Sequence, residues 1–406
     1  MQSSCRICGG VVLKSIDLGQ QPRGNGFLLP RDVENELTFH LTMGLCGSCT
    51  MAQLQGEVPQ ELRYHESYPY HASVSAVHRE HFEGNARYFL EHELTGPDPF
   101  IVEIGSNDGV MLATIAQAGV RHLGVEPSKE VAELSMARGV RVLSEFFDET
   151  TATKIRLEHG PADVIFGANC IAHIAHLASV CRGVESLLGP DGVFVFEEPY
   201  FGAVVDNTAF DMIYDEHSFY FAVRSIKAMA ERFGLELVNA EPLPLHGGTM
   251  RYTLGRPGMR TPAPAVAEFL DEERARGLGE HETLLRFSAR VERIRDDLNA
   301  LLARIRAEGH RVVGYGAPAK TTTVTNYCGI GPDQIPYVVD NTPAKQGRLV
   351  PGTHIPVLPP SAFHEDYPEY ALLFAWNHAE EIMAKETAFR DRGGRWILYV
   401  PDVHVL

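Results

Sequence analysis

Two Cys-x-x-Cys pairs near the N-terminus constrain the fold of this chain more than any other feature. They are Cys5 with Cys8 and Cys46 with Cys49. One such turn places two thiolates on one ion, and two turns supply the four tetrahedral ligands of a structural zinc site. Free thiols or a redox pair are the alternative interpretation, and the presence of a second pair favours zinc. The sequence therefore predicts a small N-terminal unit folded around a closed metal centre without a catalytic role.

The composition is that of an ordinary globular protein with more than one domain. The chain has 406 residues, of which 44% are hydrophobic and 22% charged. It has no apolar run long enough for a membrane helix and no signal-peptide pattern, so we expect a cytoplasmic protein with no membrane partner. The net charge of -17 argues against nucleic acid as a main partner.

Beyond residue 68 the sequence alternates short apolar runs with helical stretches, which predicts α/β units built on parallel sheets. A Pro- and Gly-rich break around 256–264 separates two such units, and an amphipathic helix ending at Gly309 follows it. We expect an α/β fold with a zinc-binding domain over 1–68, a Rossmann-like domain over 69–258 and a smaller Rossmann-like domain over 259–406. The expected strands are 100–104, 122–125, 163–166, 192–197, 312–315, 337–340, 371–376 and 396–400.

A glycine loop follows the first expected strand of the central unit. Its acidic-x-Gly-x-x-x-Gly spacing is typical of domains that bind S-adenosylmethionine (SAM), and it matches neither the dinucleotide pattern nor the P-loop. An acid closes the next strand, where it suits the hydroxyls of a ribose. A NAD-binding domain is the alternative interpretation. The candidate cofactor residues are Glu103, Gly105, Asn107, Asp108, Gly109, Glu126 and Asn169.

Polar side chains cluster after the expected strands of the same unit. Within residues 214–217 a phenol, a carboxylate and an imidazole stand close together, and a carboxylate beside a histidine can fix its tautomer. Asn169 and His173 would share a helix face if that stretch is helical. Ligands of open α/β sheets bind beyond the carboxyl ends of the strands, so we expect these groups to share one site.

The second α/β unit contains a strand, a glycine turn and a helix start over 313–320. Free amides at a helix N-terminus, helped by Lys320, predict a site for a phosphate or pyrophosphate. A tight turn without a ligand is the alternative. The candidate substrate-binding residues are His246, Gly247, Tyr315, Lys320, Lys345 and Trp376.

In this combination the chain resembles the SAM-dependent C-methyltransferases that act on nucleotide-linked deoxysugars in bacterial secondary metabolism, above all the C-3 methyltransferases of branched sugars. The resemblance covers almost the whole chain. Asp215 stands where the first His of a Tyr-His-Glu-His motif is expected, and Pro318 with Thr321-Thr322-Thr323 replaces smaller residues. The resemblance is carried by the Cys pairs and by 77–82, 103–109, 169–173, 214–217, 246–248, 314–320 and 326–327.

The resemblance implies SAM and structural zinc as cofactors, and a TDP-4-keto-deoxysugar held partly by the C-terminal domain. A base would remove the proton alpha to the ketone, and the enolate carbon would then take the methyl group. We expect His217 to be this base, oriented by Glu216, with Tyr68 as the rival base. Tyr214 or His173 would stabilise the oxyanion. The residues implied to line the active site are Tyr68, His71, His173, Tyr214, Glu216 and His217.

Three other functions compete with this interpretation. One is an O- or N-methyltransferase of a small natural product or sugar, which needs no α-proton chemistry. Another is a NAD-dependent oxidoreductase that uses the C-terminal unit. The third is a zinc-dependent regulatory protein that senses SAM. The identity of the sugar, the stereochemistry and the oligomeric state are left open by the sequence.

Overall fold

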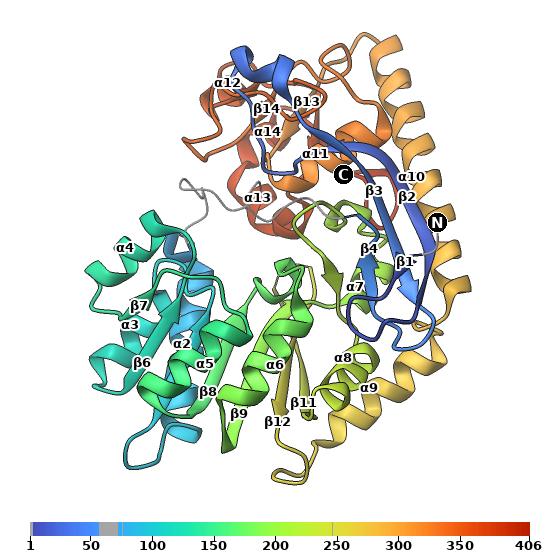
Figure 1. The fold of residues 1–406 in the computed structure, drawn as a ribbon. Helices are drawn as coiled ribbons and strands as arrows, with labels where there is room; N and C mark the ends of the chain where they lie inside the picture. The colour runs from blue at the N-terminus through green and yellow to red at the C-terminus, as the bar shows by residue number, and fades with distance from the viewer. Residues whose placement is uncertain (1–2, 57–71, 75, 246) are drawn as a thin grey trace.

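The computed structural model describes residues 3–56, 72–74, 76–245 and 247–406. These residues form three sheets, one in each of an N-terminal, a central and a C-terminal unit. Figure 1 shows the N-terminal strands running beside the long helix α10, between the C-terminal and central units. No helix among the described residues is long and apolar enough to span a membrane.

The N-terminal sheet is antiparallel and has the strand order β1-β2-β3-β4-β10. Its last strand comes from the central region of the sequence and pairs with β4. One 3-10 helix, η1 (Pro30–Asn35), begins at a proline, as expected at a first helical position. The strands are β1 (Ser3–Ser4), β2 (Val11–Pro22), β3 (Thr38–Cys46), β4 (Ala52–Leu54) and β10 (Phe219–Tyr220).

The central sheet has the order β11-β12-β9-β8-β5-β6-β7, and its five strands from β9 to β7 are parallel. Both faces are covered, because Val102 of β5 packs in one core cluster and its neighbour Ile101 packs in another. The strands are β5 (Phe100–Ile104), β6 (Arg121–Val125), β7 (Val142–Leu143), β8 (Ala162–Ala168), β9 (Leu188–Pro199), β11 (Glu236–Leu243) and β12 (Thr249–Gly255).

Helices α2 and α3 pack together at the central sheet, as do α5 and α6. Helix α5 is preceded by Asp148, whose carboxylate accepts a hydrogen bond from the Thr151 amide and so caps the helix. The helical segments of this unit are η2 (Ala72–Val74), α2 (Ala76–His92), α3 (Val110–Gln117), α4 (Lys129–Ala137), α5 (Glu149–His159), η3 (Ile171–His173), α6 (Leu177–Leu187), α7 (Phe201–Asp206), η4 (Phe210–Met212) and α8 (Val223–Arg232).

The C-terminal sheet has the order β15-β14-β13-β16-β17-β18, parallel except at the β18 edge. Its strands are β13 (Val312–Tyr315), β14 (Val338–Val339), β15 (Val357–Leu358), β16 (Tyr370–Leu373), β17 (Arg395–Leu398) and β18 (His404–Val405). Its helical segments, with the two helices that lead into them, are α9 (Pro264–Ala275), α10 (His281–Ala307), α11 (Ala319–Cys328), α12 (Ser361–Glu365), η5 (Trp376–His378), α13 (Ala379–Lys385) and α14 (Thr387–Asp391).

The N-terminal unit contacts both other units. Besides the β4–β10 pairing, Leu28 forms a β-bridge with Leu349. The carboxylate of Glu36 is 2.8 Å from the His354 ring and accepts a hydrogen bond from the Gly352 amide. Buried side chains from all three units belong to one continuous core cluster. The metal-bearing unit is therefore packed into the rest of the molecule.

The α/β architecture predicted from the sequence is confirmed, with a strand at each expected position. Some of these strands begin or end at residues other than those expected. The strand expected over 371–376 stops at Leu373, because Trp376 begins the 3-10 helix η5. The division at residues 68 and 258 stays a prediction.

Candidate active site and metal centre

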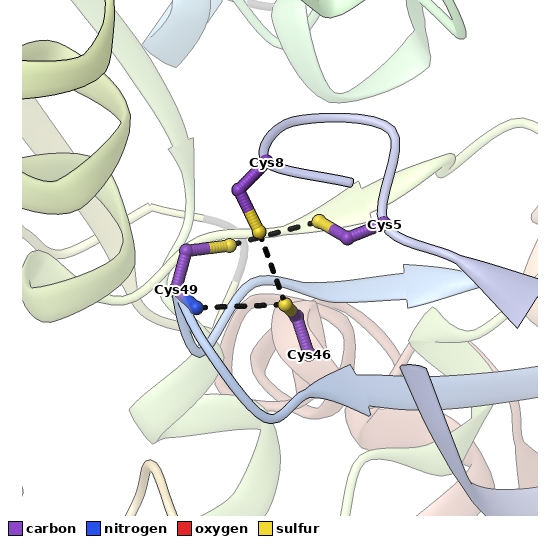
Figure 2. A group of neighbouring side chains, drawn as sticks. All are labelled: Cys5, Cys8, Cys46 and Cys49. Atoms are coloured by element: carbon purple, nitrogen blue, oxygen red, sulfur yellow. Dashed lines mark hydrogen bonds between the residues drawn. The ribbon is translucent and has the colours of Figure 1, made fainter. Parts of the chain in front are cut away.

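Four cysteines meet at one end of the N-terminal sheet (Figure 2). The Sγ atoms of Cys5 and Cys49 are 3.6 Å apart, and those of Cys8 and Cys46 are 3.4 Å apart. A Zn–S bond of about 2.3 Å in a tetrahedron separates neighbouring sulfurs by about 3.8 Å, so the cluster fits zinc. Because cysteines would fill all four positions, the site is a closed, structural one.

A pocket opens beyond the carboxyl end of β5, and we call it the glycine-loop pocket. Gly105 and Gly109 both have a positive φ, 66° and 75°. A Cβ on Gly109 would lie 2.2 Å from the Ser135 hydroxyl, and one on Gly105 would lie 2.9 Å from Cys170 Cβ. Only glycine can both adopt this positive φ without strain and leave room for the neighbouring side chains at these positions. The pocket is lined by residues 103–107, 125–128 and 168–170, among others.

Two buried carboxyl groups line the glycine-loop pocket. Glu126 accepts hydrogen bonds from the amides of Asn107 and Ser128 at 3.0 and 2.9 Å. Oε2 of Glu103 has no hydrogen-bond partner among the described residues. Burial, together with the charges of Glu126 and Asp108, raises the pKa of Glu103 well above its usual value. These carboxyl groups can accept more hydrogen bonds and can pair with a positive charge. A ligand with a positive charge and hydroxyl groups, such as SAM, would supply both.

The other predicted cofactor residues have distinct positions. Asn169 lines the pocket with φ 54°, and its amide donates to the Glu197 carbonyl. Asn107 has φ 48°, and its side-chain oxygen accepts from the Ala72 amide. Asp108 accepts from the hydroxyl of Ser73 and pairs with Arg138 at 3.4 Å. It therefore fixes η2, the short helix that precedes α2.

The segment from η4 to β10, residues 211–218, carries the predicted base, and we call it the His217 loop. Nδ1 of His217 is 2.9 Å from the Met212 carbonyl oxygen. A carbonyl only accepts, so Nδ1 carries the hydrogen and Nε2 keeps its lone pair. The Tyr214 hydroxyl is 3.0 Å from Nε2 and donates to it. His217 is buried, which lowers its pKa to about 4 with a further contribution from the charge of Lys320. The ring is therefore neutral at pH 7, with its basic nitrogen at Nε2.

The expected orientation of His217 by Glu216 is wrong. The imidazole is oriented by a backbone carbonyl at Nδ1, and the Glu216 carboxylate accepts a hydrogen bond from the Asn25 side chain at 2.8 Å. The neighbouring Asp215 accepts from the Gly24 amide, also at 2.8 Å. The adjacent acids of the loop therefore contact the N-terminal unit.

His173 joins the His217 loop to the glycine-loop pocket. It lines the pocket, and its ring centroid is 5.0 Å from that of His217. The condition for a helix face shared by Asn169 and His173 is not met, because the stretch between them is not one continuous helix. Asn169 has a left-handed backbone before the 3-10 helix η3, which spans three residues only. Both residues nevertheless line the same pocket.

Lys320 and Trp376 of the C-terminal unit meet the central unit beside the His217 loop. The Lys320 ammonium lies 4.5 Å from the Trp376 ring centroid and donates to Asn377 at 2.9 Å. The Trp376 indole donates to the buried carboxylate of Asp211 at 2.7 Å. A Cβ on Gly247 would lie 2.8 Å from the same indole ring. Burial lowers the pKa of Lys320, opposed by the charge of Asp211.

The remaining substrate candidates separate into two places. The Lys345 ammonium donates to the Ala317 carbonyl at 2.8 Å, and the charges of Asp340 and Glu216 oppose the lowering of its pKa by burial. The Tyr315 ring packs against Phe363 and Trp396, and its hydroxyl donates to Glu386 at 2.8 Å. The Tyr315 hydroxyl is therefore engaged by a buried carboxylate of its own unit.

The glycine turn before α11 leads into a helix whose first residue is Ala319 and whose start has no side-chain cap among the described residues, so the anion site stays a prediction. The Ala317 amide donates to the Asp340 carboxylate at 2.6 Å. Two of the three threonines that depart from the family pattern face other units: Thr322 donates to the Gly24 carbonyl and Thr323 to the Ile213 carbonyl. The predicted residues Tyr68, His71 and His246 lie outside the described residues.

A buried charge network that was not predicted from the sequence lies at the end of β9. Glu197 accepts from Asn85 at 2.9 Å, lies 2.6 Å from the His81 ring and pairs with Arg251 at 2.8 Å. Burial works to raise the pKa of Glu197, but His81 and Arg251 outweigh it and lower that pKa. Next to it, burial raises the pKa of Glu198 to about 8. Two adjacent acids at the end of an apolar strand were the signal in the sequence.

Three family profiles match successive parts of the chain. Residues 5–64 match a family described as "Putative zinc binding domain", residues 79–240 match "Methyltransferase domain", and residues 244–401 match "C-methyltransferase C-terminal domain". A curated relative, the C-methyltransferase NovU of Streptomyces niveus, is 34% identical over 405 residues. That match covers 99% of this chain and 96% of the relative.

Solved structures match the chain in part. A SAM-dependent methyltransferase from Anabaena variabilis is 16% identical with a TM-score of 0.35, covering 43% of this chain and 84% of that one. Magnesium protoporphyrin IX methyltransferase from Synechocystis, solved with bound SAM, is 10% identical with a TM-score of 0.34, covering 50% and 86%.

Proposed function

The chain belongs to the SAM-dependent C-methyltransferase family, and from that premise we propose that it methylates the carbon alpha to the ketone, C-3, of a TDP-4-keto-deoxysugar through an enolate. The zinc at the four cysteines is structural. The sugar, its nucleotide and the methylated carbon belong to the proposal, and so do the roles of the individual residues.

The geometry of His217 carries the proposal. A carbon beside a ketone becomes nucleophilic only after it loses a proton, so C-methylation needs a base where N-methylation of an amine does not. His217 is buried and neutral, with Nδ1 fixed on a carbonyl and its basic nitrogen, Nε2, accepting from the Tyr214 hydroxyl. Its ring contacts His173, which lines the glycine-loop pocket. A base beside the donor pocket is what this reaction requires.

The glycine-loop pocket would hold the methyl donor. Glu126 would bind the ribose hydroxyls, and the unpaired oxygen of Glu103 would face the positive charge of the ligand. When bound, SAM supplies an electrophilic methyl group. The chain itself contributes the position of the acceptor carbon and the removal of its proton, and holding reactants together accounts for a large part of such rate enhancements.

The proton moves from the sugar carbon to Nε2 of His217. In the structure the Tyr214 hydroxyl donates to that nitrogen. We expect the substrate to take over this hydroxyl, which would then donate to the developing oxyanion and free Nε2 as the base. His173, beside the His217 ring, is the second candidate for this stabilisation. Tyr68 remains the rival base.

Two lysines of the C-terminal unit, Lys320 buried and Lys345 half-buried, would meet the nucleotide. Lys320 interacts with the charge of Asp211, and Lys345 with the charges of Asp340 and Glu216. Burial lowers the pKa of both, so a diphosphate nearby would favour their charged forms. Their position beside the His217 loop supports a substrate that carries its anionic group on one side of the ketone.

The test is to incubate the zinc-loaded protein with methyl-13C-labelled SAM and a panel of TDP-4-keto-deoxysugars, and to follow product mass and carbon NMR. We expect a new methyl group bonded to carbon next to the ketone. A methyl group on oxygen or nitrogen would contradict the enolate mechanism. A product with the methyl group on another carbon would contradict the assignment of C-3.

A further inference from the structure

The strand that follows His217 is held by the metal-bearing sheet. β10 pairs antiparallel with β4, with Phe219 opposite Gln53 and Tyr220 opposite Ala52. The Leu54 amide extends this pairing by donating to the Ser218 carbonyl at 3.1 Å. The C-terminal end of the His217 loop is therefore anchored on a strand that lies more than 160 residues earlier in the sequence.

One arginine of the first cysteine turn reinforces this anchor. Arg6 stands between Cys5 and Cys8, and its guanidinium donates to the Ser218 carbonyl at 2.7 Å and to the Leu54 carbonyl at 3.1 Å. The same group lies 4.5 Å from the centroid of the Phe219 ring. A guanidinium has its donors in a rigid fork, so one side chain contacts both strands and the aromatic ring between them.

Gln53 links the same arginine to the cysteine cluster. Its side-chain oxygen accepts from the Arg6 backbone amide at 3.1 Å and from Nε of Arg6 at 3.4 Å. Its side-chain nitrogen donates to Sγ of Cys5 at 3.1 Å. A metal ion held by the four cysteines would fix the turn that carries Arg6, and Gln53 would orient its side chain.

The ring of His217 depends on the path of its loop, because Nδ1 is anchored on the Met212 carbonyl of that loop. Asp211 holds the first end through Trp376 and Tyr399 of the C-terminal unit. Ser218, next to His217, is held by Arg6 at the other end. The two ends are thus fixed by two different units.

We propose that Arg6 is a positioning residue for methyl transfer: it ties the zinc turn to Ser218 and so keeps the His217 ring at the glycine-loop pocket. The inference rests on the proposed role of His217 as the base. Arg6 acts only through the loop and exchanges no proton. The zinc site is then a distant part of the catalytic machinery, connected to it by Arg6 together with Gln53 and the β4–β10 pairing.

The first test compares Arg6→Ala and Arg6→Lys with Arg31→Ala in the full-length, zinc-loaded protein. Arg31 is a matched control, since it lies in the same unit with an exposed side chain whose nearest acid is Asp32 at 3.8 Å. We expect Arg6→Ala to keep one zinc per chain and its SAM affinity while kcat falls about 10- to 100-fold, because a shift near 1 Å costs about 100-fold. KM for the keto-sugar should change less than threefold. Arg6→Lys should recover part of kcat, because an ammonium can donate to Ser218.

A second readout follows the ring itself. In protein labelled with 15N-histidine, the signals absent from His217→Asn identify His217 and its Nδ1–H tautomer. We expect Arg6→Ala to shift or broaden these signals, and Arg31→Ala to leave them unchanged. Unchanged His217 signals in Arg6→Ala would overturn the proposal.

A double-mutant cycle separates this inference from the proposed function. If Arg6 acts through His217, then Arg6→Ala in a His217→Asn background should change the remaining rate less than twofold. Near-normal turnover of His217→Asn would overturn the proposed base. A crippled His217→Asn with a normal or fully additive Arg6→Ala would overturn the role of Arg6 alone. Loss of zinc from both Arg6 variants would overturn it too, since Arg6 would then act on the metal site.

Discussion

The glycine-loop pocket and the His217 loop sit side by side but are built in different ways. The pocket takes its walls from the ends of neighbouring parallel strands of one sheet, and most of its lining lies within residues 103–128 and 168–174. The His217 loop is held by contacts to Arg6, Gly24 and Asn25 at one end of the chain and to Trp376 and Tyr399 at the other.

This difference in construction separates the binding of the methyl donor from the binding of the acceptor. A donor that is the same in every SAM-dependent enzyme can be bound by a local motif, because its shape and charge do not change. An acceptor site assembled from three units can change its partners in one unit without disturbing the donor. We therefore expect substitutions in the glycine-loop pocket to change the binding of the donor, and substitutions around the His217 loop to change the reaction of the acceptor.

The largest expected effect is that of His217→Asn. The amide can still donate to the Met212 carbonyl, so the loop should keep its path while the base is lost. General-base catalysis contributes about 10²- to 10⁴-fold, and kcat should fall within that range. SAM affinity, measured by calorimetry, should stay within twofold of the wild type. A parallel loss of SAM binding would break the separation between the two regions.

Glu103→Gln should act on the donor alone. The carboxylate has an unpaired buried oxygen and a raised pKa, and a hydrogen bond to a charged group is worth about 1.5–3 kcal/mol. We expect SAM to bind about 10- to 100-fold more weakly, with KM for the sugar unchanged.

The same acid predicts a pH dependence for donor binding. A positively charged ligand favours ionised Glu103, so binding should release protons and tighten as the pH rises toward the raised pKa. Calorimetry in buffers with different ionisation enthalpies measures this release. Proton uptake, or a release that persists in Glu103→Gln, would contradict the assignment.

Lys320→Gln should act on the acceptor alone. Removing this buried cation beside the His217 loop should raise KM for the nucleotide sugar about tenfold, the size of one charge-assisted contact of about 1.4 kcal/mol. SAM affinity should not change. Steady-state kinetics with each substrate varied in turn would reveal the opposite result, a change in SAM affinity with an unchanged sugar KM.

The smallest effect is expected from Tyr315→Phe. The sequence placed Tyr315 among the substrate residues, but its hydroxyl donates to the buried carboxylate of Glu386. Losing that bond should lower the free energy of unfolding by about 1 kcal/mol and leave both KM values unchanged. Denaturant unfolding beside steady-state kinetics tests this. A raised sugar KM with normal stability would return Tyr315 to the acceptor region.

The contrast between the glycine-loop pocket and the His217 loop also explains which features could be predicted from the sequence. The cysteine pairs, and the strand that leads into the glycine loop, are defined by the spacing of residues that are close in the sequence. Both could therefore be predicted from the sequence alone. The orientation of His217 was not, because the choice between the Met212 carbonyl and the Glu216 carboxylate depends on where Asn25 lies. The contact between Trp376 and Asp211 joins residues 165 apart in the sequence, and no local pattern encodes it. The network around Glu197 likewise needs Asn85 and Arg251 brought together by the sheet.

The most direct test of the central claim is deuterium exchange at the carbon alpha to the ketone. The keto-sugar is incubated in D2O with the protein and S-adenosylhomocysteine, which fills the donor site without a methyl group, and proton NMR follows the α position. The account predicts exchange with the wild type that His217→Asn abolishes. No exchange with the wild type, or equal exchange with both proteins, would contradict the assignment of His217 as the base.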